Sequence, residues 1–430
     1  MMMPYSAYKD SKLDWLGKIP SHWDLVKLGA CFKERNEKVS DKDFAALSVT
    51  KNGILPQMEH VAKTDAGDNR KKVCIGDFVI NSRSDRKGSS GTSDYDGSVS
   101  LISIILEPRL YEPRFAHHLL RSYNFQEEFY KYGKGIVADL WSTRYSDMKN
   151  IFVPLMPIAE QKAIATFLDR ETQRIDSLIE EKQTFIKLLK EKHQALISHV
   201  VTKGLNPNVE MQDSGIEWIG QVPKHWIVRR LKHTSTLQSG IAKGKDNAGK
   251  ETLSIPMLRV ANVQDGYVKL DDVHEINVLP HEVERYALKG GDVLMNEGGD
   301  NDKLGRGTVW KEQIKPCIHQ NHVFVIRVTD IEPEWLGWLT QSSYAKFYFF
   351  RVSKQSTNLA SISSTNVKEV HLLIPPADER KIIMEYLEKQ TSKLKLLVQD
   401  VEESITLLKE HRTSLISAAV TGKIDVREAV

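Results

Sequence analysis

Two long stretches of the chain place apolar side chains at alternating steps of four and three residues. A heptad pattern sustained over about five repeats predicts a two-helix coiled coil. Forty helical residues would span roughly 60 Å at a rise of 1.5 Å per residue. Glycines follow both stretches, at Gly204 and Gly422, where we expect the helices to end. The predicted seam consists of Leu168, Ile175, Ile179, Ile186, Leu189 and Leu196 in the first stretch, and of Leu387, Leu394, Val398, Val401, Ile405, Leu408 and Leu415 in the second.

The chain repeats itself in two registers. Residues 10–28 match residues 213–231 without a gap at a shift of 203, with eight identities that include two Trp pairs and one Pro pair. Residues 157–202 match residues 376–421 at a shift of 219. The sixteen-residue difference between the shifts falls in the segments between these repeats. The flanks of each half are therefore alike while the middles diverge.

The divergent middles have the pattern of short strands between turns. Two further segments, Phe115–Tyr130 and Trp335–Arg351, are predicted helices. Glycine-rich polar loops at 82–93 and 297–308 follow two turn-then-strand segments. The predicted strands are Val99–Leu106, Val323–Val328, Gly76–Asn81 and Gly291–Asn296.

These patterns predict an α+β protein with two similar domains, a pair of long helices and a pseudo-two-fold internal repeat. The predicted segments are 1–156 (first domain), 157–205 (first helix), 206–375 (second domain) and 376–430 (second helix and tail). We expect the two helices to form an antiparallel coiled coil, which would separate the two domains by its length. Parallel pairing is the alternative, but the second domain would then have to bridge that whole length.

Composition favours a cytoplasmic protein without a membrane segment. No apolar run approaches the roughly 18 residues that a membrane span needs, and residues 1–10 lack the apolar core of a signal peptide. Cys31, Cys74 and Cys317 are isolated, so neither a disulfide framework nor a zinc site is predicted. The net charge of +3 in 430 residues is nearly neutral. Any nucleic-acid face must therefore come from local clustering of charge.

The sequence predicts no catalytic, cofactor-binding or metal site. The glycine-lysine stretch at 244–250 is followed by Glu251, where a phosphate-binding loop needs a Ser or Thr hydroxyl. The turn at 206–208 lacks the second Pro and the aromatic of an amino-methyltransferase loop. The pair His117 and His118 has no carboxylate at ligand spacing, so ordinary packing is the simpler interpretation. We therefore expect a binding protein rather than an enzyme.

Three motifs carry a resemblance to a known family. Each half begins with W-[LI]-G-x-[IV]-P-x-H-W, the first helix begins with Met156-Pro157-x-x-Glu160-Gln161, and Gly-Asp precedes a strand at 76 and 291. The chain resembles the specificity subunit of type I restriction-modification systems, and the resemblance covers nearly the whole sequence. One departure is Arg380 at the second helix start, where the family pattern has Gln.

The resemblance implies a non-catalytic, sequence-specific DNA-binding subunit. Each target-recognition domain would read one half of a bipartite, asymmetric site, and the coiled coil would fix the distance between the halves. The implied partners are double-stranded DNA and two methyltransferase subunits, with S-adenosylmethionine on the methyltransferase. A restriction subunit that hydrolyses ATP is left open. Two alternatives are a methyltransferase or nuclease in its own right, and a coiled-coil scaffold without DNA readout.

Candidate DNA-binding residues cluster in polar loops. Base edges are read by Arg, Lys, Asn and Gln, and phosphates are held by Lys, Arg, Ser and Thr. The Trp-containing repeats are predicted to be packing or docking elements, because two identical motifs cannot distinguish two half-sites. For each candidate the alternative is an ordinary solvated loop charge. The candidates are Arg83, Arg86, Lys87, Asn301, Lys303, Arg306, Lys51, Asn52, Arg259, Asn262, Lys243 and Lys245.

Overall fold

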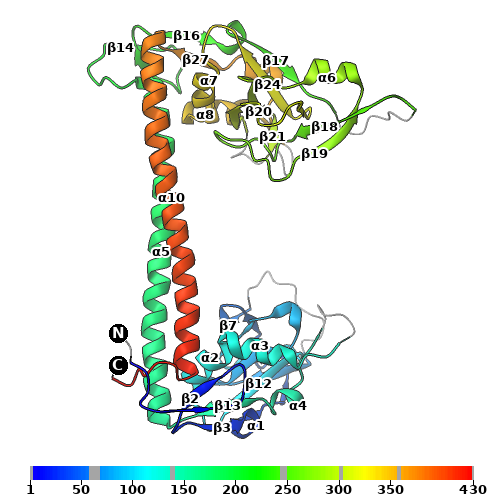
Figure 1. Ribbon diagram of the computed structural model, residues 1–430, viewed down its shortest axis with the longest axis vertical. Coiled ribbons are helices and arrows are strands. Elements are labelled where there is room, and N and C mark those ends of the chain that lie inside the picture. The colour runs from blue at the N-terminus through cyan, green and yellow to red at the C-terminus, as the bar shows by residue number, and fades with distance from the viewer. Residues whose placement is uncertain are drawn as a thin grey trace. The chain divides into compact units, whose positions relative to one another are not determined.

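The computed structural model describes residues 3–57, 68–135, 141–242, 249–299, 304–355 and 360–428. The chain forms two compact units (Figure 1). Unit 1 comprises Met1–Gln183 with Glu402–Val430, and unit 2 comprises Thr184–Val401. Each unit takes part of both long helices, α5 (Ile158–Lys203) and α10 (Ala377–Val420). These units combine segments far apart in the sequence and divide each long helix between them. The predicted division into two domains and two helices, consecutive in the sequence, therefore stays a prediction.

Unit 1 is built around a four-stranded antiparallel sheet of order β10-β9-β12-β4. A three-stranded sheet of order β11-β8-β5 and the hairpin β6–β7 lie beside it, and α2 packs on β9 and β10. The strands are β1 (Tyr8–Asp10), β2 (Lys18–Pro20), β3 (Asp24–Lys27), β4 (Phe32–Glu34), β5 (Lys38–Val39), β6 (Leu47–Thr50), β7 (Gly53–Pro56), β8 (Arg70–Val73), β9 (Phe78–Asn81), β10 (Ser90–Thr92), β11 (Gly97–Val99), β12 (Ser103–Pro108) and β13 (Phe152–Leu155). The helices are α1 (Leu28–Cys31), α2 (Pro113–Arg121), α3 (Tyr123–Lys131), α4 (Tyr145–Met148) and the 3-10 turn η1 (Ser84–Arg86).

Unit 2 repeats this plan, with a four-stranded sheet of order β17-β24-β20-β22 and α7 packed on β20 and β22. The hairpin β14–β15 and the pair β16–β27 correspond to β1–β2 and β3–β13. The strands are β14 (Met211–Asp213), β15 (Gln221–Pro223), β16 (Ile227–Arg230), β17 (Ser235–Ser239), β18 (Leu253–Leu258), β19 (His274–Val278), β20 (Val293–Asn296), β21 (Gly298–Gly299), β22 (Gly307–Val309), β23 (Ile318–His319), β24 (Val323–Val328), β25 (Lys354–Gln355), β26 (Ala360–Ser361) and β27 (His371–Ile374). The helices are α6 (Pro280–Tyr286), α7 (Pro333–Thr340), α8 (Ser343–Val352), α9 (Ser364–Lys368) and the 3-10 turn η3 (Leu231–His233).

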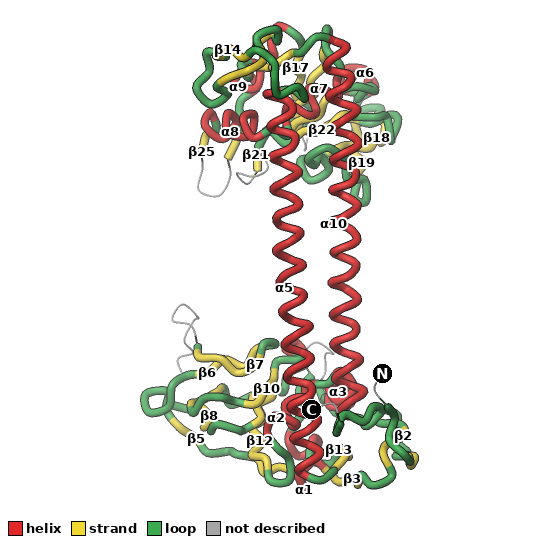
Figure 2. The backbone as a smooth tube through the Cα atoms, turned by 90° about the vertical axis from the view of Figure 1, so that its left-hand side faces the viewer, coloured by secondary structure: helices red, strands yellow, loops and turns green. Residues whose placement is uncertain are grey.

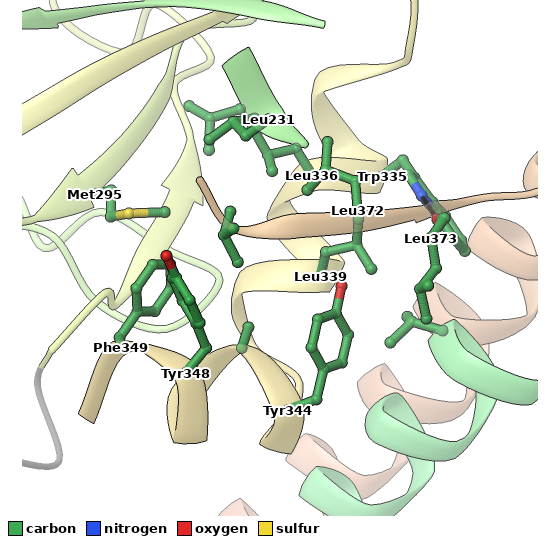
Figure 3. Packing of buried hydrophobic residues seen from close by; sticks show 14 of the residues in the cluster. Leu231, Met295, Trp335, Leu336, Leu339, Tyr344, Tyr348, Phe349, Leu372 and Leu373 are labelled. Atoms are coloured by element: carbon green, nitrogen blue, oxygen red, sulfur yellow. Dashed lines mark hydrogen bonds between the residues drawn. The ribbon is translucent and has the colours of Figure 1, made fainter. Parts of the chain in front are cut away.

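The core of unit 2 lies between α7, α8 and the sheet. Figure 3 shows Trp335 of α7 beside Leu373 of β27, and Tyr348 and Phe349 of α8 directed toward Met295 of β20. Helix α5 joins the same core through Ile197, Val200 and Val201, and α10 joins it through Ile383 and Leu387. The helix residues that the heptad pattern selects are thus part of a domain core as well as of a helix pair.

Three predicted elements are each divided in the structure. The apolar run Val99–Leu106 is two strands of different sheets, β11 and β12, because a turn closes where Ser103 N–H donates to Ser100 O at 3.0 Å. The predicted helix Phe115–Tyr130 is α2 and α3, broken at Ser122, whose side chain accepts the N–H of Phe125 as an N-cap. The predicted helix Trp335–Arg351 breaks at Ser342 in the same way. The fold class, α+β, is as predicted.

In each unit the two long helices run antiparallel (Figure 2). In unit 1 the start of α5 lies near the chain after α10, and further along Asp176 pairs with Arg412 at 2.9 Å. In unit 2 the end of α5, at Gly204, lies against Glu379 near the start of α10. All the predicted seam residues are buried or half-buried, whereas leucines on other faces, such as Leu188 and Leu407, are more than half exposed.

The Trp-containing repeat joins the globular part of each unit to both long helices. In unit 1 the indole N–H of Trp23 donates to Glu160 Oε1 at 2.9 Å, and His22 Nε2 lies 2.9 Å from Oε2. Gly422, after α10, lies against the same indole. We call this contact set the helix joint. It explains why two separate segments repeat, since the motif and the helix-start glutamate bind each other.

Unit 2 has an equivalent helix joint. Trp226 donates to Glu379 Oε1 at 3.2 Å, His225 Nε2 lies 2.7 Å from Oε2, and Gly204 contacts the indole. The predicted packing role of the repeated motifs is therefore what the structure shows. The joint of unit 1 has one more donor, the Tyr5 hydroxyl at 2.8 Å from Glu160 Oε1.

Arg380, which stands where the family pattern has Gln, makes the same connection as Gln161 but through an ion pair. In unit 1 the buried Gln161 amide accepts the Glu112 backbone N–H and donates to Leu110 O and Met156 O. In unit 2 the Arg380 guanidinium instead forms a two-point ion pair with the Glu332 carboxylate, at 2.6 and 3.2 Å. The same helix start is thus tied to the segment before α2 or α7 in both units.

Acid is expected to destabilise unit 2 through His319. The ring is 1% exposed and donates to Val323 O at 2.7 Å, and burial lowers its pKa to about 4. The unfolded chain therefore binds this proton first, and stability falls as the pH drops from about 6.5 toward 4, by about 2–3 kcal/mol in all. Urea unfolding at pH 7.5 and pH 4.5 measures the loss. In His319→Gln the difference between the two pH values should shrink; an unchanged difference would contradict the assignment.

Candidate nucleic-acid interface

A concave pocket of about 630 Å³ opens in unit 1 between the hairpin β6–β7, the end of β9 and the turn η1. Four basic side chains line it, together with one carboxylate and several neutral polar groups. A surface of this composition suits a polyanion with hydrogen-bonding edges. The charged lining residues are Lys51, Arg70, Arg83, Asp85 and Arg86, and Asn81 and Gln57 are among the neutral polar ones.

Three candidates predicted from the sequence meet in this pocket. Lys51 comes from the hairpin turn, and Arg83 and Arg86 come from the loop after β9. The side chains of Arg83 and Arg86 are 46% and 68% exposed, and their Nε atoms lie 3.8 and 3.7 Å from the Asp85 carboxylate. These separations are longer than a hydrogen bond. The carboxylate therefore reduces the net positive charge of the pocket but does not hold either guanidinium in one position.

Two arginines, the buried Arg70 and the half-buried Arg121, contact the hairpin through Leu47 O and Lys51 O. Arg70 donates to Ser98 Oγ and Ser98 O, both at 2.9 Å, and burial lowers its pKa. Arg121, at the end of α2, donates to Lys51 O at 2.5 Å, and its pKa is lowered by burial and by Arg412. An arginine stays charged despite such shifts. Neither residue was among the sequence candidates, because nothing local distinguishes a supporting arginine from a solvated one.

Lys87 and Asn52 lie at the edge of this region and do not line the pocket. Lys87 pairs with Glu127 of α3, and its ammonium lies 5.7 Å from the centre of the Tyr130 ring. Asn52 is exposed in the hairpin turn, where its backbone N–H donates to Thr50 Oγ1. Lys87 is therefore held toward α3.

In unit 2 the loop between β18 and β19 closes over the end of β20, where the Asn296 amide donates to Val260 O and Val263 O. Asn262 is 2% exposed, and its amide donates to Lys269 O and Asp272 O, so this candidate shapes the loop from inside. Arg259 pairs with Asp272 at 2.9 Å. Arg306 donates to Gln264 Oε1 at 2.9 Å and is 19% exposed. Arg259 and Arg306 thus both contact this loop.

The other candidates, Asn301, Lys303, Lys243 and Lys245, lie outside the described residues. Among the described residues no group of three or more His, Cys, Asp or Glu side chains is placed to hold a metal ion. No helix in the described part of the chain is long and apolar enough to cross a membrane.

Comparisons with known proteins agree with the fold. The family described as "Type I restriction modification DNA specificity domain" matches residues 223–406. The EcoKI specificity subunit of Escherichia coli (strain K12) is 23% identical over 95% of this chain and 90% of its own length. The StySPI specificity subunit of Salmonella potsdam is 22% identical over 82% of this chain and 76% of its own length.

Solved structures share the architecture. One chain from a structure described as "Structural basis underlying complex assembly and conformational transition of the type I R-M system" superposes with a TM-score of 0.71 at 16% identity, covering 94% of this chain and 98% of that chain. The HsdS subunit from Thermoanaerobacter tengcongensis gives 0.58 at 18% identity, covering 96% and 100%. The resemblance predicted from the sequence is confirmed: this chain is similar, along nearly its whole length, to the specificity subunits of type I restriction-modification systems.

Proposed function

We propose that this chain is the non-catalytic DNA specificity subunit of a type I restriction-modification complex. The observation that carries the proposal is a pair of units with one sheet order and different loops at the end of the same strand. Unit 1 has a basic pocket after β9, whereas unit 2 has a loop packed over the end of β20. Two units that share a sheet order but differ in the surface at the end of the equivalent strand suit a target made of two different half-sites.

The helix joints support a fixed geometry within each unit. A joint couples the globular part to both long helices through a buried indole and a buried or half-buried glutamate. A reading surface held in this way cannot swivel on its helices without breaking those hydrogen bonds. Fixed placement of two reading surfaces would give the target a constant gap, since half-site spacing follows protein spacing.

The partners belong to the proposal as well. The matching flanks would bind two copies of a methyltransferase subunit, which carries S-adenosylmethionine, and a restriction subunit with ATP would complete a cleaving complex. No cofactor is proposed for this chain. A scaffold without DNA readout is the second candidate, but it gives no reason for Lys51, Arg83 and Arg86 to converge on one pocket.

A methylation map tests the proposal. The chain is expressed with its neighbouring methyltransferase subunit in a host without DNA methylation, and modified bases are located by single-molecule sequencing. We expect modified adenines in two short, different half-sites across a constant gap. A contiguous or palindromic motif would contradict the two-unit reading. Absence of modification, with the same methyltransferase active beside another specificity subunit, would favour the scaffold.

A further inference from the structure

The charged side chains that line the pocket of unit 1 are mostly hydrogen-bond donors. Its exposed charged donors are Lys51, Arg83 and Arg86, and its single carboxylate is Asp85. The Asn81 amide oxygen already accepts the backbone N–H of Arg83 at 3.1 Å. Side-chain carboxylates are the usual acceptors for the cytosine amino group, and only Asp85 is present here.

Arg83 is the best placed of these groups to contact a base. Its backbone is fixed on two sides, by the Asn81 hydrogen bond and by an antiparallel bridge to Ser142. Its side chain is less exposed than that of Arg86, which stands farther out on η1. Lys51 faces the pocket from the hairpin turn, which Arg121 holds through Lys51 O. Arg83 is thus the inner guanidinium of the pocket. The more exposed Arg86 and the exposed Lys51 of the hairpin turn are the two outer cations.

Guanine is the base whose edge fits that inner group. In the major groove guanine offers two acceptors, O6 and N7, which a guanidinium binds at two points. Adenine offers one acceptor and one donor there, thymine offers one acceptor and a methyl group, and cytosine offers a donor, so none of the three satisfies an arginine as well. Arg86 and Lys51, as outer cations, suit the flanking phosphates.

We propose that unit 1 reads a half-site containing guanine, with Arg83 binding the guanine edge and Arg86 and Lys51 binding phosphates. This inference rests on the proposed function and adds the identity of one base. At the sequence position equivalent to Arg83, two residues after Asn296, unit 2 has Gly298, which has no side chain to contact a base. The amide of Asn296 is moreover covered by the loop that supplies Val260 O and Val263 O. The Arg83-dependent guanine therefore belongs to one half-site only.

The test compares methylation maps of the complete complex containing wild-type chain, Arg83→Ala, Arg86→Ala or Lys87→Ala. Arg83→Ala should lower the preference for guanine at one position of one half-site by roughly five- to 150-fold and leave the other half-site unchanged. Arg86→Ala should weaken binding to all sequences alike and reduce the salt dependence of binding by about one phosphate contact. Lys87→Ala is the matched control, since Lys87 is held toward α3, and its map should equal the wild-type map.

A second measurement needs only the wild-type complex and so holds even where Arg83→Ala fails to assemble. Wild-type complex is titrated with target DNA in which each guanine in turn is replaced by 7-deazaguanine, which lacks the N7 acceptor. One replacement should weaken binding roughly tenfold. A bipartite target whose two half-sites tolerate every replacement would overturn this inference and leave the proposed function intact. A wild-type map without two half-sites would overturn both.

Discussion

Trp23→Ala should lower the free energy of unfolding of unit 1 by about 3–5 kcal/mol. The indole is completely buried, donates to Glu160 Oε1 at 2.9 Å, and packs edge-on against Tyr5 with ring centroids 5.8 Å apart. Removing it leaves a cavity at the helix joint and takes away one of the two donors to the buried Glu160 Oε1. Both effects destabilise the folded state. The loss should spread through unit 1, because the globular part meets α5 and the end of α10 at this joint.

Hydrogen exchange of the full-length chain measures this loss unit by unit. Protection should fall in residues 8–34 and 152–175, while unit 2 keeps the protection of wild type. Trp23→Phe is the matched control, because it retains most of the buried ring and loses the hydrogen bond, at a cost of about 1–3 kcal/mol. Equal protection in unit 1 of Trp23→Ala and wild type would show that the joint does not stabilise the unit.

Gly422→Ala should destabilise unit 1 by about 2–5 kcal/mol, far more than Gly204→Ala destabilises unit 2. Both glycines have φ in the left-handed region, +71° and +74°, so an alanine is strained at either site. A Cβ on Gly422 would lie 2.3 Å from Cδ of Pro20 and 3.0 Å from the Trp23 ring. A Cβ on Gly204 would meet only Glu379 Oε1 and the Trp226 ring, both at 3.2 Å.

The pair separates backbone strain from steric overlap within one experiment. Gly204→Ala carries mainly the strain, about 1–2 kcal/mol, and Gly422→Ala adds the overlap with a rigid proline ring. Thermal unfolding of both variants, with hydrogen exchange to assign the affected unit, gives the two values. Similar losses in the two variants would mean that Pro20 can move away, and that the joint of unit 1 is looser than its contacts indicate.

The sequence predicted those features that depend on local periodicity. The heptad positions led to α5 and α10, and the Gly-Asp segments led to β9 and β20, since neighbouring residues alone set both patterns. The contact between Trp23 and Glu160 could not be predicted in this way, because 137 residues separate the partners. Both repeats were visible, but no periodicity indicates that one binds the other.

The sequence predicted which loops form the candidate interface, but it did not predict what each residue in those loops does. Lys51, Arg83 and Arg86 meet because a hairpin and a strand end are adjacent in space. Asn262 is of a residue type that reads bases, yet its amide donates to two backbone carbonyls within its own loop. Exposure of a polar side chain depends on how the surrounding loop closes, and residue type alone does not reveal it.

The two helix joints also bear on how such a gene can change. Each joint combines a tryptophan and a glutamate from one half of the chain with a glycine that follows the long helix of the other half. A deletion between the repeated segments would leave one tryptophan, one glutamate and one terminal glycine in a chain of half the length. Such a product would contain every part of a joint but would have to exchange helix ends with a second copy to assemble it. Loss of half the gene would thus turn an internal repeat into a dimer of two identical halves.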